Sequence, residues 1–314
     1  MALYASRRVG LALVIVLCAM AVLFGMIHLV PGDPITIALG PRATEAMRQA
    51  YLARMRLDQP VYLQFLAFAG GVLRGDLGAD VFSNRSVTTI VFEQLPYTLA
   101  LAGAGLGWAA LLGIPLGCYS AIRRNSFFDK LSGVITVGAI AVPSFVVALY
   151  ALLIFAVWLR WLPAIGAGEE GDLGDQLLHL ILPAFAIGLG WVGYLARLVR
   201  ASMLEVMGEN FIRTARAFGL PERTIVYRYA LKIAILPTVT LLGVGIGNLL
   251  SGAVFAEIVF SRPGIGKLIY DMAITRNYPV VQGAVLITTA LFVLSALFAD
   301  LLNAWLDPRV RAGL

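Results

Sequence analysis

Six long stretches of the chain are apolar almost throughout and contain no Asp, Glu, Lys or Arg. Each is at least 21 residues long, and about 20 helical residues, at about 1.5 Å each, cross the ~30 Å hydrocarbon core of a bilayer. The pattern therefore predicts six transmembrane helices, within residues 9–32, 94–122, 131–159, 176–196, 233–256 and 277–299. A β-barrel is disfavoured because its strands alternate apolar and polar residues over about ten positions.

The composition of the chain agrees with a membrane location. Of its 314 residues, 60% are hydrophobic and only 13% are charged, and the mean hydropathy is +0.87. These values lie far outside the usual range of soluble domains. The chain is therefore predicted to be an all-α membrane protein that is in contact with the lipid bilayer.

Glycine and proline recur inside the predicted spans. Glycines cluster at residues 103–107, 188–193 and 243–247, and small residues of this kind allow membrane helices to pack closely. Proline removes a backbone hydrogen bond, so Pro115, Pro143 and Pro183 are predicted to kink or break their helices.

Lysine and arginine are concentrated in alternate connections between the predicted spans. Cytoplasmic connections of membrane proteins have an excess of these residues. By this rule the cytoplasmic side holds both termini, the second connection and the fourth, with Arg7, Arg8, Arg123, Arg124, Lys130, Arg197, Arg200, Arg213, Arg216, Arg223, Arg228, Lys232, Arg309 and Arg311. The acidic third connection is predicted to lie outside. The formal net charge of +6 thus needs no nucleic acid as a partner.

Four regions follow from this topology. Residues 1–30 form an N-terminal segment and the first span, which is expected to be an uncleaved anchor because its apolar run is too long for a signal peptide. Residues 31–94 form an extracytoplasmic subdomain, with a predicted helix at residues 44–57, that acts as a lid or as a docking surface. Residues 95–303 form a core of five transmembrane helices that includes a loop at 202–232, and residues 304–314 form a cytoplasmic tail.

No sequence motif for catalysis, a cofactor or a metal is found. "SRPGIGKL" at residues 261–268 resembles a phosphate-binding loop, but the Walker pattern requires Gly at Ser261 and Ser or Thr at Leu268. Cys18 and Cys118 fall inside predicted spans, where cysteine is usually a small hydrophobic residue. The chain is therefore predicted to have no enzymatic activity of its own.

Polar residues at the centres of the predicted spans are few, and none is charged. This disfavours a proton- or sodium-coupled carrier, which needs ionisable or coordinating groups at the midplane. Asn248 and Ser251, one helical turn apart in the fifth span, are candidates for a translocation path, although an interhelical hydrogen bond explains them equally well. Pro143 is a third candidate, because a kink suits a helix that changes shape.

The basic loop between the fourth and fifth spans has the pattern of a helix, a tight turn and a second helix. Asn210 is a candidate helix cap, and Gly219 is the residue type that ends helices in the left-handed conformation. Pro221 is expected to start the next helix in its first turn, with Glu222 near the positive end of the helix dipole. One predicted apolar stripe contains Phe211, Ile212, Ala215 and Phe218, with Arg213 and Arg216 away from it.

Three functions fit such a loop. A DNA-binding helix-turn-helix needs a third helix and a core of its own, for which this short tethered segment leaves little room. A loop that only touches anionic lipid explains the arginines but not the well-defined helix ends. The third function is a protruding helix that inserts into a cytoplasmic partner, with phenylalanine and leucine as anchors.

The residues of this loop also resemble a known family. "RTARAFGLPERTIVYRYALKIAILP" is similar to the EAA loop of permease subunits in ATP-binding-cassette (ABC) importers, in the B-type version of the dipeptide, oligopeptide and nickel group. "PGDP", "LDQP", "GDLG", "GIPLG", "WLPAIG", "ILPAF", "RPGIGKL" and "YPVVQG" follow in the order found in that group. Arg56, Asn277 and the stretch Leu231–Lys232 depart from the patterns of the group and the wider family, which leaves the subgroup and substrate open.

The resemblance implies a type I ABC-importer permease in a bacterial cytoplasmic membrane. Its implied partners are a second homologous permease, two cytoplasmic ATPase subunits or domains and an extracytoplasmic substrate-binding protein. The implied ATPase-coupling residues are Phe211, Ile212, Arg213, Thr214, Ala215, Arg216, Phe218, Gly219 and Leu220. Di- or oligopeptides are the leading substrates, with glutathione, nickel chelates or opines as alternatives. A membrane-embedded lipid-modifying enzyme is the alternative from another class, and it would need a cluster of His, Asp or Glu.

Overall fold

The computed structural model describes residues 2–29, 44–45, 49 and 59–306. Within them the secondary structure is helical apart from one isolated bridge between Ala79 and Ser86. The described helices are α1 (Ala2–Leu29), α4 (Val61–Leu73), α5 (Val87–Ile122), α6 (Phe127–Ala141), α7 (Ser144–Ala151), η1 (Leu152–Trp158), α8 (Leu173–Met207), α9 (Asn210–Ala217), α10 (Glu222–Thr224), η2 (Ile225–Ala230), α11 (Leu231–Ala234), α12 (Leu236–Val259), α13 (Ile265–Ile274) and α14 (Tyr278–Leu306). The all-α prediction is confirmed for this part of the chain.

Five of these helices, α1, α5, α8, α12 and α14, are long and apolar enough to cross a membrane. A sixth span is reached only if the bent pair of α6 with α7 and η1 counts as one, because the two parts meet at 98°. The kink or break predicted at Pro143, within residues 131–159, is therefore confirmed. Val142 is extended and Pro143 precedes α7, where its missing N–H and its ring interrupt the helix.

The other two prolines have a different outcome. Pro115 lies inside α5 and Pro183 inside α8, and both helices continue through them. A break at these positions is therefore excluded. Neighbouring helices in a packed bundle support such prolines, so a proline alone does not predict a break.

Helices α5 and α8 pack against each other along much of their length and form the centre of the bundle. Glycine allows this approach: a Cβ at Gly113 would lie 2.9 Å from the Val192 carbonyl oxygen. A Cβ at Gly188 would overlap the Trp108 ring, whose Nε1 donates a hydrogen bond to the Ala184 carbonyl at 2.8 Å. The contact at Gly188 confirms the predicted packing role for that glycine at the α5–α8 interface, whereas a Cβ at Gly103 or Gly107 would meet nothing within 4 Å.

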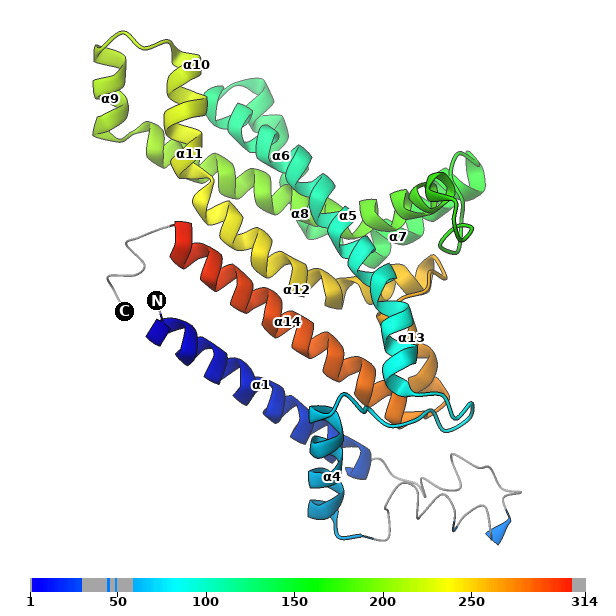
Figure 1. The fold of residues 1–314 in the computed structure, drawn as a ribbon. Helices are drawn as coiled ribbons and strands as arrows, with labels where there is room; N and C mark the ends of the chain where they lie inside the picture. The colour runs from blue at the N-terminus through cyan, green and yellow to red at the C-terminus, as the bar shows by residue number, and fades with distance from the viewer. Residues whose placement is uncertain (1, 30–43, 46–48, 50–58, 307–314) are drawn as a thin grey trace.

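The start of α1, the end of α14 and helix α9 lie toward the same end of the bundle, as Figure 1 shows. Arg8 of α1 forms an ion pair with Asp300 of α14 at 2.7 Å. Helices α4 and α13 lie toward the opposite end. This arrangement agrees with an even number of membrane crossings between the two termini.

Helix α4 was not predicted from the sequence. Its Phe65 and Phe68 contact Phe24 of α1, with ring centroids 5.5 and 6.3 Å apart. The helix predicted at residues 44–57 falls almost wholly outside the described residues.

Candidate functional site

Helix α9 projects from one end of the bundle (Figure 1). Two of its side chains anchor it there. Ile212 is completely buried and Ala215 is 6% exposed. Both belong to an apolar cluster that includes Cys118 of α5, Met203 of α8 and residues of η2 and α11. The predicted protruding helix is therefore present and is packed firmly on the ends of two long helices.

The C-terminal end of α9 is fixed by a glycine turn. Gly219 has φ +74°, the left-handed conformation that glycine adopts without a steric penalty. Its N–H donates to the Arg216 carbonyl at 2.9 Å, and the Leu220 N–H donates to the Ala215 carbonyl at 3.3 Å. These two bonds form a Schellman motif, and Leu220 also packs on the apolar cluster. The predicted glycine stop is confirmed.

Two predicted helix starts are corrected by the structure. Asn210 is the first residue of α9 and not its cap; the cap position belongs to Glu209, whose side chain makes no capping hydrogen bond. Pro221 was expected in the first turn of the helix, but it occupies the cap position just before α10. Its extended backbone (ψ 140°) is not helical. Its carbonyl still accepts the N–H groups of Thr224 and Ile225, so it does begin the helix.

The outer face of α9 differs from the single apolar stripe that was predicted. Ile212 and Ala215 point into the bundle, whereas Phe218 is 82% and Phe211 39% exposed. Arg213, Thr214 and Arg216 are also exposed. The exposed surface therefore combines two aromatic side chains with two arginines, residue types that are enriched at the centres of protein–protein interfaces.

Arg216 and Glu222 connect α9 to the helix that follows. The Arg216 guanidinium donates to both Glu222 carboxylate oxygens, at 2.8 and 3.3 Å. These hydrogen bonds lower the pKa of Glu222 and raise that of Arg216. Both side chains are substantially exposed, so the pair contributes about 0–1 kcal/mol, and it mainly restricts the angle between α9 and α10.

The three candidates for a translocation path are all on the surface of the described chain. Pro143 lies at the bend between α6 and α7, and Asn248 and Ser251 lie on an exposed side of α12. Ser251 also lines a cavity of about 350 Å³ between α5, α12, α13 and α14, together with Thr98, Thr288 and Thr289.

A buried carboxylate, Glu257 near the end of α12, escaped the sequence analysis. It is completely buried and accepts hydrogen bonds from the Thr98 hydroxyl at 2.6 Å and the Lys267 N–H at 3.0 Å. Thr98 in turn accepts the Ile265 N–H at 2.8 Å. The "RPGIGKL" loop thus donates a backbone N–H to a carboxyl group, as a phosphate-binding loop does to a phosphate, but the group is a side chain of the same protein. The resemblance of this loop to a phosphate-binding loop was the sequence signal that could have indicated a buried acidic partner.

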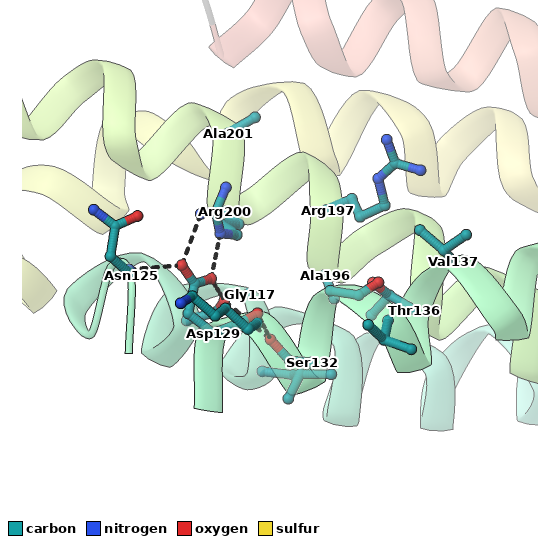
Figure 2. A pocket seen from close by; sticks show the side chains of 15 residues that line it. Gly117, Asn125, Asp129, Ser132, Thr136, Val137, Ala196, Arg197, Arg200 and Ala201 are labelled. Carbon is teal, nitrogen blue, oxygen red and sulfur yellow. Dashed lines mark hydrogen bonds and ion pairs between the residues drawn. The ribbon is translucent and has the colours of Figure 1, made fainter. Parts of the chain in front are cut away.

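A second buried acid, Asp129 of α6, was also missed. It is 6% exposed and accepts two hydrogen bonds from Arg200 of α8, at 2.6 and 2.9 Å. Figure 2 shows this pair together with the Asn125 N–H, which donates to the same carboxylate at 2.9 Å. A cavity of about 790 Å³ lies beside the pair, between α5, α6 and α8. The count of lysine and arginine that predicts orientation ignores acids, so Asp129 gave no signal.

Asn277, one of the positions that depart from the related group, has a clear structural partner. Its side-chain amide donates a hydrogen bond to Asp80, which also accepts the N–H groups of Phe82 and Ser83. Burial raises the pKa of Asp80, but these hydrogen bonds and that of the Ser83 hydroxyl outweigh it, so the pKa is lowered. The pair joins the segment before α5 to the start of α14.

Comparison with known proteins places this geometry in a family. The model of the binding-protein-dependent transport system inner membrane component matches residues 113–312, and the model of its N-terminal part matches residues 1–102. A dipeptide transport system permease protein of Alkalihalophilus pseudofirmus is 34% identical, with 98% of this chain and 99% of that protein covered. A glutathione transport system permease protein of Pectobacterium atrosepticum is 35% identical, with 98% of each chain covered.

A solved structure has the same fold. The inward-facing MetNI methionine ABC transporter matches with a TM-score of 0.59 and 18% identity, covering 69% of this chain and 96% of that one. The two family models together span nearly the whole sequence, with the N-terminal model first and the main model after it. The chain therefore belongs to the binding-protein-dependent transport system inner membrane components, the permease subunits of ABC importers.

Proposed function

We propose that this permease imports di- or oligopeptides and forms the translocation path together with a second, homologous permease. Relatives named as dipeptide permeases support this substrate class. Glutathione, itself a small peptide derivative, is the second candidate, because glutathione permeases match at a similar identity. The family implies ATPase and binding-protein partners in general; two ATPases and one extracytoplasmic binding protein are the proposed set.

The observation that supports the coupling role best is the division of α9 into a buried and an exposed side. Ile212, Ala215 and Leu220 fix the helix to the bundle, while Phe211, Arg213, Thr214, Arg216 and Phe218 are exposed on its outer surface. A rigidly attached helix with an aromatic surface suits the transfer of movement from an ATPase to the spans. Gly219 sets the length of this helix.

Asn248, Ser251 and Pro143 are proposed to face the path or the second permease. Lipid-exposed surfaces of membrane helices are apolar, because a polar group in hydrocarbon lacks hydrogen-bond partners. Asn248 and Ser251 are exposed on a helix whose other exposed residues, Pro237, Ile246 and Phe255, are apolar, so a polar surface or another protein is expected to cover them. The bend at Pro143 is proposed as the point where α6 and α7 change their relative angle.

The topology of the proposed complex follows from the charge distribution. Both termini and the loop with α9 are proposed to lie in the bacterial cytoplasm, and residues 31–94 outside as a subdomain that contacts the binding protein.

Replacing Gly219 by Asp tests the coupling role. The substitution places a charged side chain at φ +74° in the α9 turn, so we expect ATP hydrolysis to continue while uptake falls. Uptake of a dipeptide and of glutathione is measured in proteoliposomes that contain all partner subunits, beside ATP hydrolysis. Gly171→Asp is the matched control, because Gly171 has φ +90° and open space around it, and it lies before the start of α8 whereas α9 follows the end of that helix. Normal uptake by the assembled Gly219→Asp complex would refute the coupling role.

A further inference from the structure

Helix α6 has an inverted distribution of polar and apolar side chains. Its buried residues are Asp129, Ser132 and Thr136, which lie on one side of the helix at helical spacing. Its exposed residues include Phe127 at 81% and Val134 at 72%. An apolar outer surface suits contact with lipid, so it is the polar side of α6 that attaches it to the rest of the protein.

The attachment is concentrated at Asp129. Besides the two bonds from Arg200, its carboxylate accepts the Ser120 hydroxyl of α5 at 2.5 Å and the Asn125 N–H of the α5–α6 turn. Ser132 lies 3.1 Å from Ser120 and extends the network by one turn. One carboxylate therefore connects α6 to α5, to the turn between them and to α8.

Apart from Asp129, the buried residues of α6 are only Ser132 and Thr136, so α6 has no fully buried apolar side chain in this contact. A cavity of about 790 Å³ runs beside the ion pair, and farther along the helices come into close contact at Gly193, where a Cβ would lie 2.6 Å from the Thr136 carbonyl oxygen. Figure 2 shows the Asp129 carboxylate and Arg200 facing each other across the space between the helices. The two-bond geometry of arginine with a carboxylate resists both sliding and rotation.

Arg200 is also close to the anchor of α9. Met203 of α8 is completely buried in the apolar cluster that holds Ile212, and Arg200 precedes it by three residues on the same helix. At its other end α6 leads directly into the bend at Pro143. Contacts thus run without a gap from α9 through α8 and the ion pair to α6 and the bend.

We propose that the Asp129–Arg200 pair is a positioning clasp that transmits movement of α9 and α8 to α6 and to the bend at Pro143. The proposal rests on the coupling role of α9. It differs from a purely structural role because loss of the clasp should separate two activities that the intact protein performs together. ATP hydrolysis should continue, while less substrate is moved for each ATP hydrolysed.

The test is a double-mutant cycle of Asp129→Asn, Arg200→Gln and the pair of substitutions together, with transport and hydrolysis measured on the same reconstituted complexes. We expect each single variant to lower the substrate moved per ATP by about 2- to 30-fold, the range of measured coupling effects. The double variant should fall little further, because the two residues act as one unit. Asp271→Asn, which breaks the partly exposed Lys267–Asp271 pair of α13, is the control and should leave the ratio unchanged.

Two results would overturn the clasp. One is a parallel loss of hydrolysis and transport with an unchanged ratio, and the other is additive losses in the double variant. If the single variants do not assemble, Arg200→Lys is used instead, because it keeps the charge and one hydrogen bond. The substrate moved per ATP by this variant is then judged by the same criterion. Should Gly219→Asp uncouple the complex while the clasp variants do not, only the clasp fails. If Gly219→Asp leaves coupling intact, the role of α9 itself fails.

Discussion

Two apolar side chains, one in helix α9 and one at its C-cap, have opposite environments. Ile212 is completely buried among residues of α5, α8 and η2, whereas Phe218 is 82% exposed. An exposed phenylalanine next to arginine is costly to leave in water and is typical of an interface anchor. The first residue is therefore expected to contribute to stability and the second to association.

Ile212→Ala and Phe218→Ala separate these two contributions. Removing a buried isoleucine side chain destabilises a protein by about 2–5 kcal/mol, so Ile212→Ala should lower the melting temperature of the purified permease. Phe218→Ala should leave that temperature unchanged and reduce the amount of ATPase that copurifies. Thermal melts and quantitative copurification measure the two effects. Full ATPase recovery with Phe218→Ala would show that this surface is not the interface.

At the scale of elements, α12, α13 and α5 are joined through the buried Glu257. The carboxylate and Thr98 together occupy the N-terminal end of α13, where free N–H groups favour an anion. A Cβ at Gly264 would overlap this carboxylate. The glycine is required because of Glu257, since its own backbone is extended and any residue could adopt it.

Gly264→Ala and Glu257→Ala should therefore not be additive. Each alone should destabilise the permease, the first by overlap and the second by leaving buried N–H groups unpaired, at about 1–3 kcal/mol for each unpaired group. The double variant should lose less stability than the sum of the two single losses, because the Cβ at residue 264 no longer overlaps a carboxylate at residue 257. Melting temperatures give the comparison, with Gly252→Ala as a control in open space on α12. Additive losses would contradict the pairing.

The long helices could be predicted from the sequence because a bilayer requires about 20 apolar residues in each span. The angle between two helices within one apolar run could not be predicted in this way. Residues on both sides of Pro143 are apolar, so the pattern looks the same for a straight span and for the 98° bend. Pro115 and Pro183 show why the proline alone was ambiguous, since neighbouring helices there allow α5 and α8 to continue.

The candidate site was predictable only where its signal is local. Gly219 could be assigned from the turn it forms with its neighbours, and its φ of +74° agrees. Asp129 and Arg200 are 71 residues apart, and Thr98 and Glu257 are 159 apart. No local pattern reports such pairs, because only the packing of α6 with α8 and of α5 with α12 brings them together. The burial of Ile212 beside the exposure of Phe218 likewise depends on neighbours from other helices.

At the scale of the whole molecule, the start of α1 and the end of α14 lie toward the same end of the bundle as α9 (Figure 1). The second and fourth connections, which contain basic residues, are separated by two spans. They therefore lie on the same side of the membrane as each other. Anionic lipid on the cytoplasmic leaflet attracts such residues, so the arrangement supports a single orientation. The orientation decides whether α9 can reach an ATPase at all, because ATP is used in the cytoplasm.

Cysteine labelling tests this orientation in a variant without Cys18 and Cys118. Arg124→Cys and Glu170→Cys place exposed thiols in the second and third connections. A membrane-impermeant maleimide should label Glu170→Cys in intact spheroplasts and Arg124→Cys only after lysis. Val199→Cys, at a completely buried position, should stay unlabelled in both and reports unfolding. Labelling of Arg124→Cys in intact spheroplasts would place α9 outside the cell, where no ATPase could bind it.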